Sequence, residues 1–321
     1  MLRLFRLSAI MVTCLFFILV VLISQPFLFF ITVKSRVKLL TSASSIWARI
    51  LLKVLGISVR SIGILPDSSR ESFLLVSNHQ SYLDILIILS LFPAAFIAKS
   101  EVGSWPLIGW LSRLAPTVFI RRGDTLSNVQ GFYGACGLLR QGINVQVFPE
   151  GTTSDGTEVL KFSELFLASA VRTRRRVLPL TVNFQMVNGV SPDRDALDLI
   201  CWYGEMDFAS HFWKLLAIDS AEVSLVVQKP ISIEKYSRAA SVARVAEVIV
   251  KSEFDSHLSE SIAAARAQVP VELMTASTAG HPSHDEVEPI SDFVLGAILY
   301  ALLASNLNEN VYEMIPQQNE A

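Results

Sequence analysis

The chain has 321 residues, of which 51% are apolar and 17% charged, with a mean hydropathy of +0.46. This length and apolar content exclude a disordered chain and a small disulfide-stapled scaffold, and the hydropathy is typical of a protein associated with a membrane. The net charge of -2 argues against a nucleic-acid-binding protein, which needs a positive total or a stripe of Lys and Arg on its surface.

Charge and cysteine are unevenly placed along the chain. The first 66 residues carry eight Lys or Arg and no acid, whereas residues 253–321 carry eleven acids and one Arg. We therefore expect the N-terminal region to face anionic lipid. Cys14, Cys136 and Cys201 are odd in number and widely spaced, so they predict neither a disulfide framework nor a metal cluster and favour a reducing compartment.

The N-terminal region contains a candidate membrane helix. Residues 7–33 are 27 consecutive uncharged, mostly apolar residues, and a helix needs only about 20 to span a bilayer. Basic residues flank both ends, so the positive-inside rule assigns no orientation. A single spanning anchor, which we prefer, and a helix bent at Pro26 that enters and leaves on one side both fit. A cleaved signal peptide fits less well, because the apolar stretch is about twice the usual length.

A second amphipathic segment follows. The Ser- and Thr-rich residues 41–45 predict a break, and residues 46–55 have apolar side chains at helical spacing. Such a helix suits the membrane interface, with Trp47 at the level of the headgroups and Arg49 and Lys53 extended toward water. An ordinary core-facing helix fits the same pattern equally well.

The rest of the chain alternates between β-branched runs and helical patterns. The predicted strands are 73–77, 95–98, 117–120, 144–148, 177–183, 197–203 and 223–228. The predicted helices are 82–91, 105–114, 125–140, 162–172 and 236–268. This alternation predicts an α/β sheet with helices on its faces.

These patterns divide the chain into four parts. We expect a membrane-anchoring segment over 1–40, an interfacial helix and connector over 41–66, and the α/β domain over 67–268. Residues 269–321 are predicted to form a polar linker and tail, in which 293–304 form a short apolar helix that docks on a surface because it is too short to span a membrane.

The first group of candidate functional residues follows the strand predicted at 73–77, where α/β proteins place their active sites. His79 and Asp84 are five residues apart, so they meet only if His79 lies in the turn before the helix. Ser81 and Asp84 match a capping box, which points Asp84 back toward that turn. The carboxylate can then hold one imidazole nitrogen and leave the other to take a proton from a hydroxyl. Alternatively, Asp84 only caps the helix and His79 is a hydrogen-bonded turn residue.

The second group, F-P-E-G-T-T-S over residues 148–154, follows another predicted strand. If the two strands are parallel neighbours, both groups share one crevice. Gly151 allows close backbone approach, and Thr152 and Ser154 supply hydroxyl groups suited to phosphate or carbonyl oxygen. Alternatively, the segment is a polar loop in which a buried Glu150 pairs with a cation.

The pattern N-H-x-x-x-x-D followed by F-P-E-G-T-x-S resembles the 1-acylglycerol-3-phosphate acyltransferase family of membrane-bound glycerolipid acyltransferases. Residues 98–109 with 118–122 resemble the second motif of this family, and residues 177–180 resemble the fourth. Segments 98–102 and 148–156 resemble especially the bacterial branch that includes lyso-ornithine lipid acyltransferases.

The resemblance implies a mixed sheet flanked by helices, an N-terminal membrane helix, and a bacterial inner-membrane location with the active site on the cytoplasmic face. It implies acyl transfer from coenzyme A or acyl carrier protein to a lysolipid hydroxyl, with membrane lipids as surroundings and without a bound cofactor. Metal catalysis is not expected, because the motif is not at ligand spacing with any of the other histidines, His211, His257, His281 and His284. By resemblance His79 is the general base and Asp84 orients it. The residues implied in acceptor binding are Lys99, Arg121, Arg122, Glu150, Gly151, Thr152 and Ser154.

Two departures from the family pattern bear on the acceptor. Thr153 stands where many members have Arg, and Arg121 stands where an acid is frequent. Either Arg121 replaces the missing cation, or the headgroup is not a simple phosphomonoester. We expect transfer to the sn-2 hydroxyl of 1-acylglycerol-3-phosphate, which gives phosphatidic acid. The alternative is lyso-ornithine lipid O-acylation, and a second is a catalytically inactive lipid-binding protein.

Overall fold

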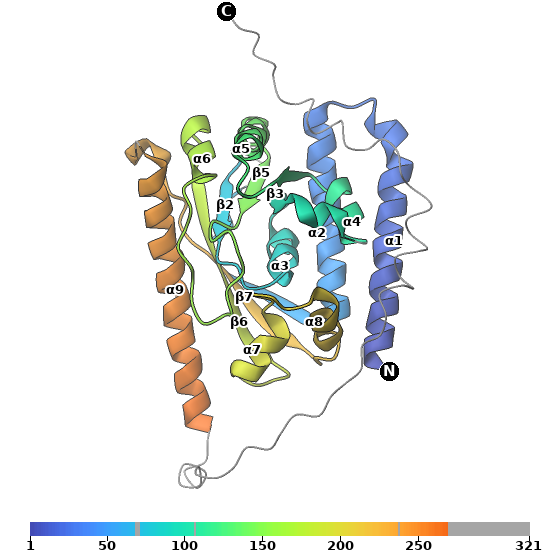
Figure 1. Cartoon of the computed structure of the whole chain (residues 1–321), viewed down its shortest axis with the longest axis vertical. Helices are drawn as coiled ribbons and strands as arrows, with labels where there is room; N and C mark the ends of the chain where they lie inside the picture. Colours follow the sequence, from blue (N-terminus) through green and yellow to red (C-terminus); the bar gives the residue numbers. More distant parts are fainter. Residues whose placement is uncertain (68–70, 106, 237, 269–321) are drawn as a thin grey trace, which may run out of the picture.

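The computed structural model describes residues 1–67, 71–105, 107–236 and 238–268, with the side chains of the last helix described to residue 257 (Figure 1). The polar linker and the apolar helix expected at 293–304 lie outside the described residues.

A seven-stranded sheet in the order β1-β7-β6-β2-β5-β3-β4 forms the centre of the described chain. The strands are β1 (Ile57–Gly63), β2 (Leu74–Ser77), β3 (Ala94–Lys99), β4 (Thr117–Ile120), β5 (Asn144–Val147), β6 (Val177–Val187) and β7 (Ala221–Val227). From β6 to β4 every neighbouring pair is parallel, whereas β7 runs antiparallel to β6 and parallel to β1. The predicted α/β fold with a mixed sheet is therefore confirmed.

Helices cover both faces of this sheet (Figure 1). On one face lie α5 (Thr125–Arg140), α6 (Leu167–Thr173) and α9 (Ala239–Gln268). On the other lie α1 (Leu2–Leu28), α2 (Val33–Leu55), α3 (Leu83–Leu91), α4 (Ile108–Leu114), α7 (Arg194–Ile200) and α8 (Phe208–Leu215). Side chains alternate between the two cores along a strand, since Leu74 and Val76 of β2 pack under α5 and α6 while Leu75 packs toward α3.

The two N-terminal helices form a hairpin. Residues 29–32 connect α1 to α2, Thr32 caps α2 by accepting from the Ser35 N–H, and Arg36 donates back to the Leu28 carbonyl at the end of α1. The rings of Phe17 in α1 and Trp47 in α2 lie 5.2 Å apart. Trp47 therefore packs on one side against α1 within the hairpin.

The break expected at residues 41–45 is wrong, because α2 runs without interruption from Val33 to Leu55. The hydroxyl groups of Thr41 and Ser44 donate to the carbonyl groups of Lys38 and Leu40 one turn earlier, which satisfies them inside the helix. Thr41, Ser44 and Ser45 are buried. Tertiary packing against α1 and α3 thus outweighs the weak helix propensity of this stretch.

The strand expected at 197–203 is also wrong. Asp193 caps α7 by accepting from the Ala196 N–H, and the helix buries Leu197 and Ile200, three residues apart. A short apolar run of this kind does not separate strand from helix by periodicity. The sequence also left β1 and α8 unassigned, and the helix expected to begin at residue 162 begins at Leu167.

Candidate active site

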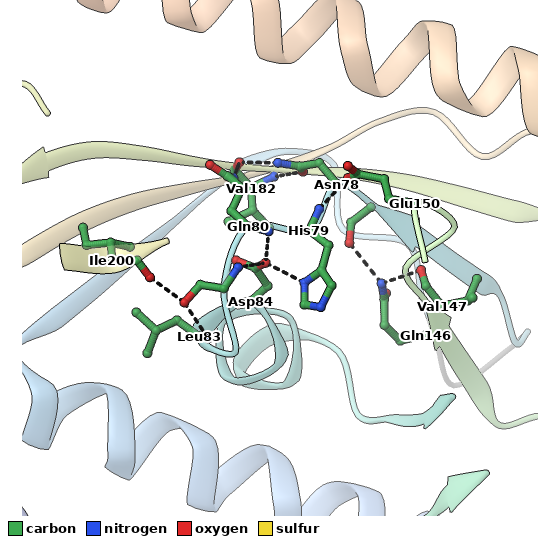
Figure 2. Close-up of polar contacts among 12 residues, drawn as sticks. Asn78, His79, Gln80, Leu83, Asp84, Gln146, Val147, Glu150, Val182 and Ile200 are labelled. Atoms are coloured by element: carbon green, nitrogen blue, oxygen red, sulfur yellow. Dashed lines mark hydrogen bonds and ion pairs between the residues drawn. The ribbon is translucent and has the colours of Figure 1, made fainter. Parts of the chain in front are cut away.

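The N-H-x-x-x-x-D segment joins β2 to α3 and brings His79 onto Asp84 (Figure 2). Asp84 is fully buried, and its Oδ2 atom lies 2.9 Å from His79 Nδ1. The same oxygen accepts the backbone N–H groups of Gln80, at 2.6 Å, and Ser81, at 2.8 Å. Because Oδ2 acts as an acceptor toward both amides, the proton between it and His79 is placed on Nδ1.

The capping geometry predicted from Ser81 and Asp84 is formed in part. The Asp84 carboxylate reaches back to the Ser81 N–H, as the capping box requires. The Ser81 hydroxyl instead donates to the Ile200 carbonyl at 2.6 Å and accepts the Leu83 N–H at 3.3 Å. Ser81 therefore also ties the start of α3 to the end of α7.

Two amide side chains fasten this loop to β6 (Figure 2). Asn78 donates to the Val182 carbonyl at 2.9 Å and accepts the Val182 N–H at 2.8 Å. The Gln80 side chain donates to the same carbonyl at 2.8 Å, and the Gln80 backbone carbonyl accepts the Trp202 N–H at 2.9 Å. The sequence alone gives no role to Asn78 or Gln80, because only the fold brings residue 182 beside residue 78.

The imidazole of His79 is held flat and stays open at one nitrogen. Its ring stacks on Phe148 with a centroid distance of 3.8 Å and an interplanar angle of 13°. The side chain is 17% exposed. With Nδ1 committed to Asp84, Nε2 remains as the nitrogen available to take a proton from a hydroxyl.

The F-P-E-G-T-T-S segment lies beside His79, since β2 and β5 are parallel neighbours. Glu150 Oε1 accepts the His79 N–H at 2.7 Å, and Oε2 accepts the Leu160 N–H at 2.8 Å. Burial raises the pKa of Glu150 to about 8, with these two hydrogen bonds acting in the opposite direction. The structure therefore does not support the alternative in which a buried Glu150 pairs with a cation, because each of its carboxyl oxygens accepts a backbone N–H.

Gly151, Thr152 and Ser154 of this segment differ in burial and in their contacts. Gly151 has a φ of +71°, a conformation that favours glycine, and allows the turn. Thr152 is exposed at the rim. Ser154 is buried and donates its backbone N–H to the His79 carbonyl at 2.8 Å, while its hydroxyl has no partner among the described residues.

The predicted cations lie at the carboxyl ends of β3 and β4, at the same edge of the sheet as His79: Lys99 is the last residue of β3, and Arg121 and Arg122 follow β4. Strands about 4.8 Å apart place β4 about 14 Å from β2. Burial lowers the pKa of Lys99, and the charge of Arg122 acts in the same direction. Arg122 lies near Gly151, since a Cβ atom at Gly151 would lie 3.9 Å from Nη2 of Arg122. Arg121 is 70% exposed and lies 3.8 Å from Asp124.

An aromatic cluster beside this site had no signal in the sequence. Tyr82 lies at the start of α3, its ring 5.2 Å from that of Phe208 and 6.2 Å from that of Trp202, and its hydroxyl is 3.0 Å from His211 Nδ1. Trp105 approaches Trp202 to 5.7 Å from the segment after β3. Within the described residues, no group of three His, Cys, Asp or Glu side chains is arranged to hold a metal ion.

Comparisons with known proteins give this geometry a context. Residues 57–183 match the model of a protein family described as Acyltransferase. The chain is 35% identical over 205 residues to the lyso-ornithine lipid O-acyltransferase of Pseudomonas aeruginosa, covering 64% of this chain and 75% of that protein. It is 30% identical to the corresponding enzyme of Brucella abortus, covering 65% and 80%.

More distant similarities point to a second group of enzymes. The 1-acyl-sn-glycerol-3-phosphate acyltransferase of Neisseria gonorrhoeae is 27% identical over 164 residues, covering 51% of this chain and 62% of that protein. The crystal structure of the 1-acyl-sn-glycerophosphate acyltransferase from Thermotoga maritima superposes with a TM-score of 0.60 and 25% identity, covering 79% of this chain and 94% of that one.

Proposed function

Because the chain belongs to the acyltransferase family, we propose that it transfers a fatty acyl group from a thioester to the hydroxyl of a lysolipid, with lyso-ornithine lipid as its acceptor. The observation that carries the proposal is the buried Asp84 carboxylate on His79 Nδ1, 2.9 Å away, which leaves Nε2 as a general base. The proposed donor is acyl coenzyme A or acyl carrier protein.

The chemistry is a direct transfer. His79 Nε2 takes the proton of the acceptor hydroxyl as its oxygen attacks the thioester carbonyl. The C–O bond forms, the C–S bond breaks, and the proton passes from the imidazolium to the leaving thiolate. The Asp84 carboxylate holds the ring in one tautomer and stabilises the imidazolium during the step.

Two observations favour lyso-ornithine lipid over the phosphate-bearing acceptor preferred from the sequence alone. The relatives described above that share 30% and 35% identity act on lyso-ornithine lipid, whereas the glycerol-3-phosphate enzyme of Neisseria gonorrhoeae shares 27%. The loop after β5 carries Thr153 where a further cation is expected, and Arg121 is drawn to Asp124. A dianionic phosphate would therefore meet fewer cations here.

Lysophosphatidic acid is the second candidate. The guanidinium of Arg122 lies close to Gly151, and such a fork-shaped cation suits a phosphate. The similarity to the Thermotoga maritima structure supports the same candidate.

The N-terminal hairpin supports a lipid acceptor and a re-entrant arrangement. Among the described helices, α1 is long and apolar enough to cross a membrane. However, α2 turns back along α1 and contacts both α3 and β1, so it is folded onto the α/β domain. A fully spanning α1 would draw that domain into the bilayer with it. We therefore favour a hairpin that enters and leaves on one side over the spanning anchor preferred from the sequence.

The test is acyl transfer by membranes that contain the wild-type chain or the His79→Ala variant, supplied with oleoyl coenzyme A and either lyso-ornithine lipid or lysophosphatidic acid. We expect ornithine lipid as the main product and a loss of roughly a thousandfold or more in His79→Ala. His257→Ala, on α9 across the sheet, is the matched control and should retain the wild-type rate.

Two results would contradict the proposal. Equal rates of wild type and His79→Ala on both acceptors would favour the inactive lipid-binding alternative. Phosphatidic acid as the main product would establish the second candidate.

A further inference from the structure

The catalytic histidine is held by the loop after β5 as well as by Asp84. Glu150 accepts the N–H of His79 at 2.7 Å, and the Ser154 N–H donates to the carbonyl of the same residue at 2.8 Å. Phe148 stacks on the imidazole at 3.8 Å. Both backbone polar groups and the ring of His79 are thus bound by one segment of seven residues, 148–154.

The Glu150 carboxyl group connects the loop before α3 to the segment before α6. One oxygen binds His79, before α3, and the other binds Leu160, ten residues further along the loop toward α6. Figure 2 shows the Glu150 carboxyl group directed at the backbone of His79. The side chain is half-buried.

This use of both oxygens differs from a role in holding the acceptor. A carboxyl group whose main role was to hold a lysolipid would keep an oxygen free for it, whereas both oxygens of Glu150 already accept a backbone N–H. The exposed Thr152 and the guanidinium of Arg122 beside Gly151 are better placed as acceptor-binding candidates.

We propose that Glu150 is a positioning residue, which fixes the backbone of His79 through its N–H and does not contact the acceptor. The proposal rests on the proposed function in that His79 is the base whose position matters. Displacement of a base by about 1 Å is enough to lower the rate about a hundredfold, so fixing this backbone bears directly on catalysis.

The test uses the full chain in detergent micelles and the Glu150→Gln variant. A glutamine keeps the size of the side chain but presents an NH2 group, which cannot accept, to one of the two amides. We expect kcat to fall about 10- to 100-fold while KM for the acceptor stays within about twofold. The matched control is Glu164→Gln, an exposed glutamate of the segment before α6, which should behave as wild type.

A second measurement needs no activity. The chain has five histidines, so selective labelling with 15N-histidine gives five backbone amide signals, and His79→Ala identifies that of residue 79. A short hydrogen bond to a carboxyl group moves an amide proton downfield. We expect the His79 signal to be downfield in wild type and in Glu164→Gln, and to move upfield in Glu150→Ala, which removes both acceptor oxygens.

The outcomes separate this proposal from the proposed function. An unmoved His79 amide signal in Glu150→Ala overturns the positioning role whether or not the protein is an acyltransferase. An increase of about tenfold or more in the acceptor KM at unchanged kcat also overturns it and assigns Glu150 to acceptor binding. A shifted amide signal in a chain that transfers no acyl group would sustain the contact and refute the proposed function instead.

Discussion

At the scale of single residues, the site depends on one buried carboxylate. Burying an ionised group is costly unless it is hydrogen-bonded, and Asp84 Oδ2 receives three N–H groups, from His79 Nδ1 and from the backbones of Gln80 and Ser81. All of them come from the turn that precedes α3. The same contacts that stabilise the helix start therefore orient His79, the proposed base.

Asp84→Asn should remove this orientation. An asparagine presents an amide that either donates toward Nδ1 and favours the wrong tautomer or leaves backbone donors unpaired, so we expect a loss of about 10³- to 10⁴-fold in the rate of acyl transfer. Initial rates at saturating acceptor measure it. Asp193→Asn, at an exposed cap of α7 where asparagine caps equally well, is the control. A loss below about tenfold would show that Asp84 only stabilises the loop.

The raised pKa of Glu150 predicts a pH-dependent stability. Burial raises it from an ordinary 4.5 to about 8, and the charges of Asp84 and Glu158 add to this. The folded chain then binds a proton that the unfolded chain has released, so the free energy of unfolding should fall by a few kcal/mol as the pH rises from about 4.5 to about 8. Thermal unfolding in detergent should show a shallower dependence in Glu150→Gln. An equal slope in both chains would mean that the carboxyl group is ionised throughout.

At the scale of elements, the N-terminal hairpin is joined to the α/β domain by its cations. Arg6 of α1 is buried and donates to the carbonyl groups of Leu216, Ile218 and Asp219 at the end of α8. Arg49 of α2 donates to the Ser90 carbonyl near the end of α3 at 2.6 Å. A cation suits the carboxyl end of a helix, where carbonyl groups lack partners. Both side chains therefore bind carbonyl groups at helix ends of the domain, Arg6 as a buried residue and Arg49 as an exposed one.

Arg6→Ala should loosen this junction. The carbonyl groups at the end of α8 lose a charged donor, and we expect the free energy of unfolding to fall by about 2–4 kcal/mol. The melting temperature in detergent reports it. Arg3→Ala, on the same helix, serves as the control, because Arg3 only faces the ring of the exposed Trp213 at 5.6 Å. Similar melting temperatures for both variants would show that the hairpin is held by apolar packing alone.

At the scale of the whole molecule, the outer side of the hairpin is apolar and exposed. Phe16 is 65% and Leu19 52% exposed on α1, and Phe29 and Phe30 are exposed at the turn. Soluble proteins rarely expose many large apolar side chains on one surface, so a bilayer is the environment that suits this side of the hairpin. A bilayer at this surface would agree with the lipid acceptor proposed above.

Charging this surface should detach the protein from membranes. The double variant Phe16→Glu and Leu19→Glu places two carboxylates where we expect hydrocarbon, which costs several kcal/mol. Liposome flotation should recover much less of it with the lipid than wild type. Val248→Glu, at a 59% exposed position on α9 across the sheet, should float as wild type does. Equal flotation of the double variant would mean that another surface binds the membrane.

What the sequence determined by itself was local. The alternation of strands and helices, the order of the motifs and the turn that brings His79 onto Asp84 depend on residues close together in the chain, where backbone geometry and capping leave few options. The sequence alone did not determine the acceptor headgroup, because the contacts of Arg121, Arg122 and Thr153 depend on neighbours that only the fold supplies.

The tertiary structure decided what lies between distant segments. Tertiary contacts stabilise residues 194–200 as a helix and keep α2 helical across its Ser- and Thr-rich stretch. They also bring Glu150 to the backbone N–H of His79, 71 residues away. Asn78 meets Val182 across 104 residues. Contacts of this kind arise from strand order and packing, which depend on the burial of the entire sheet and not on the propensity of any one segment.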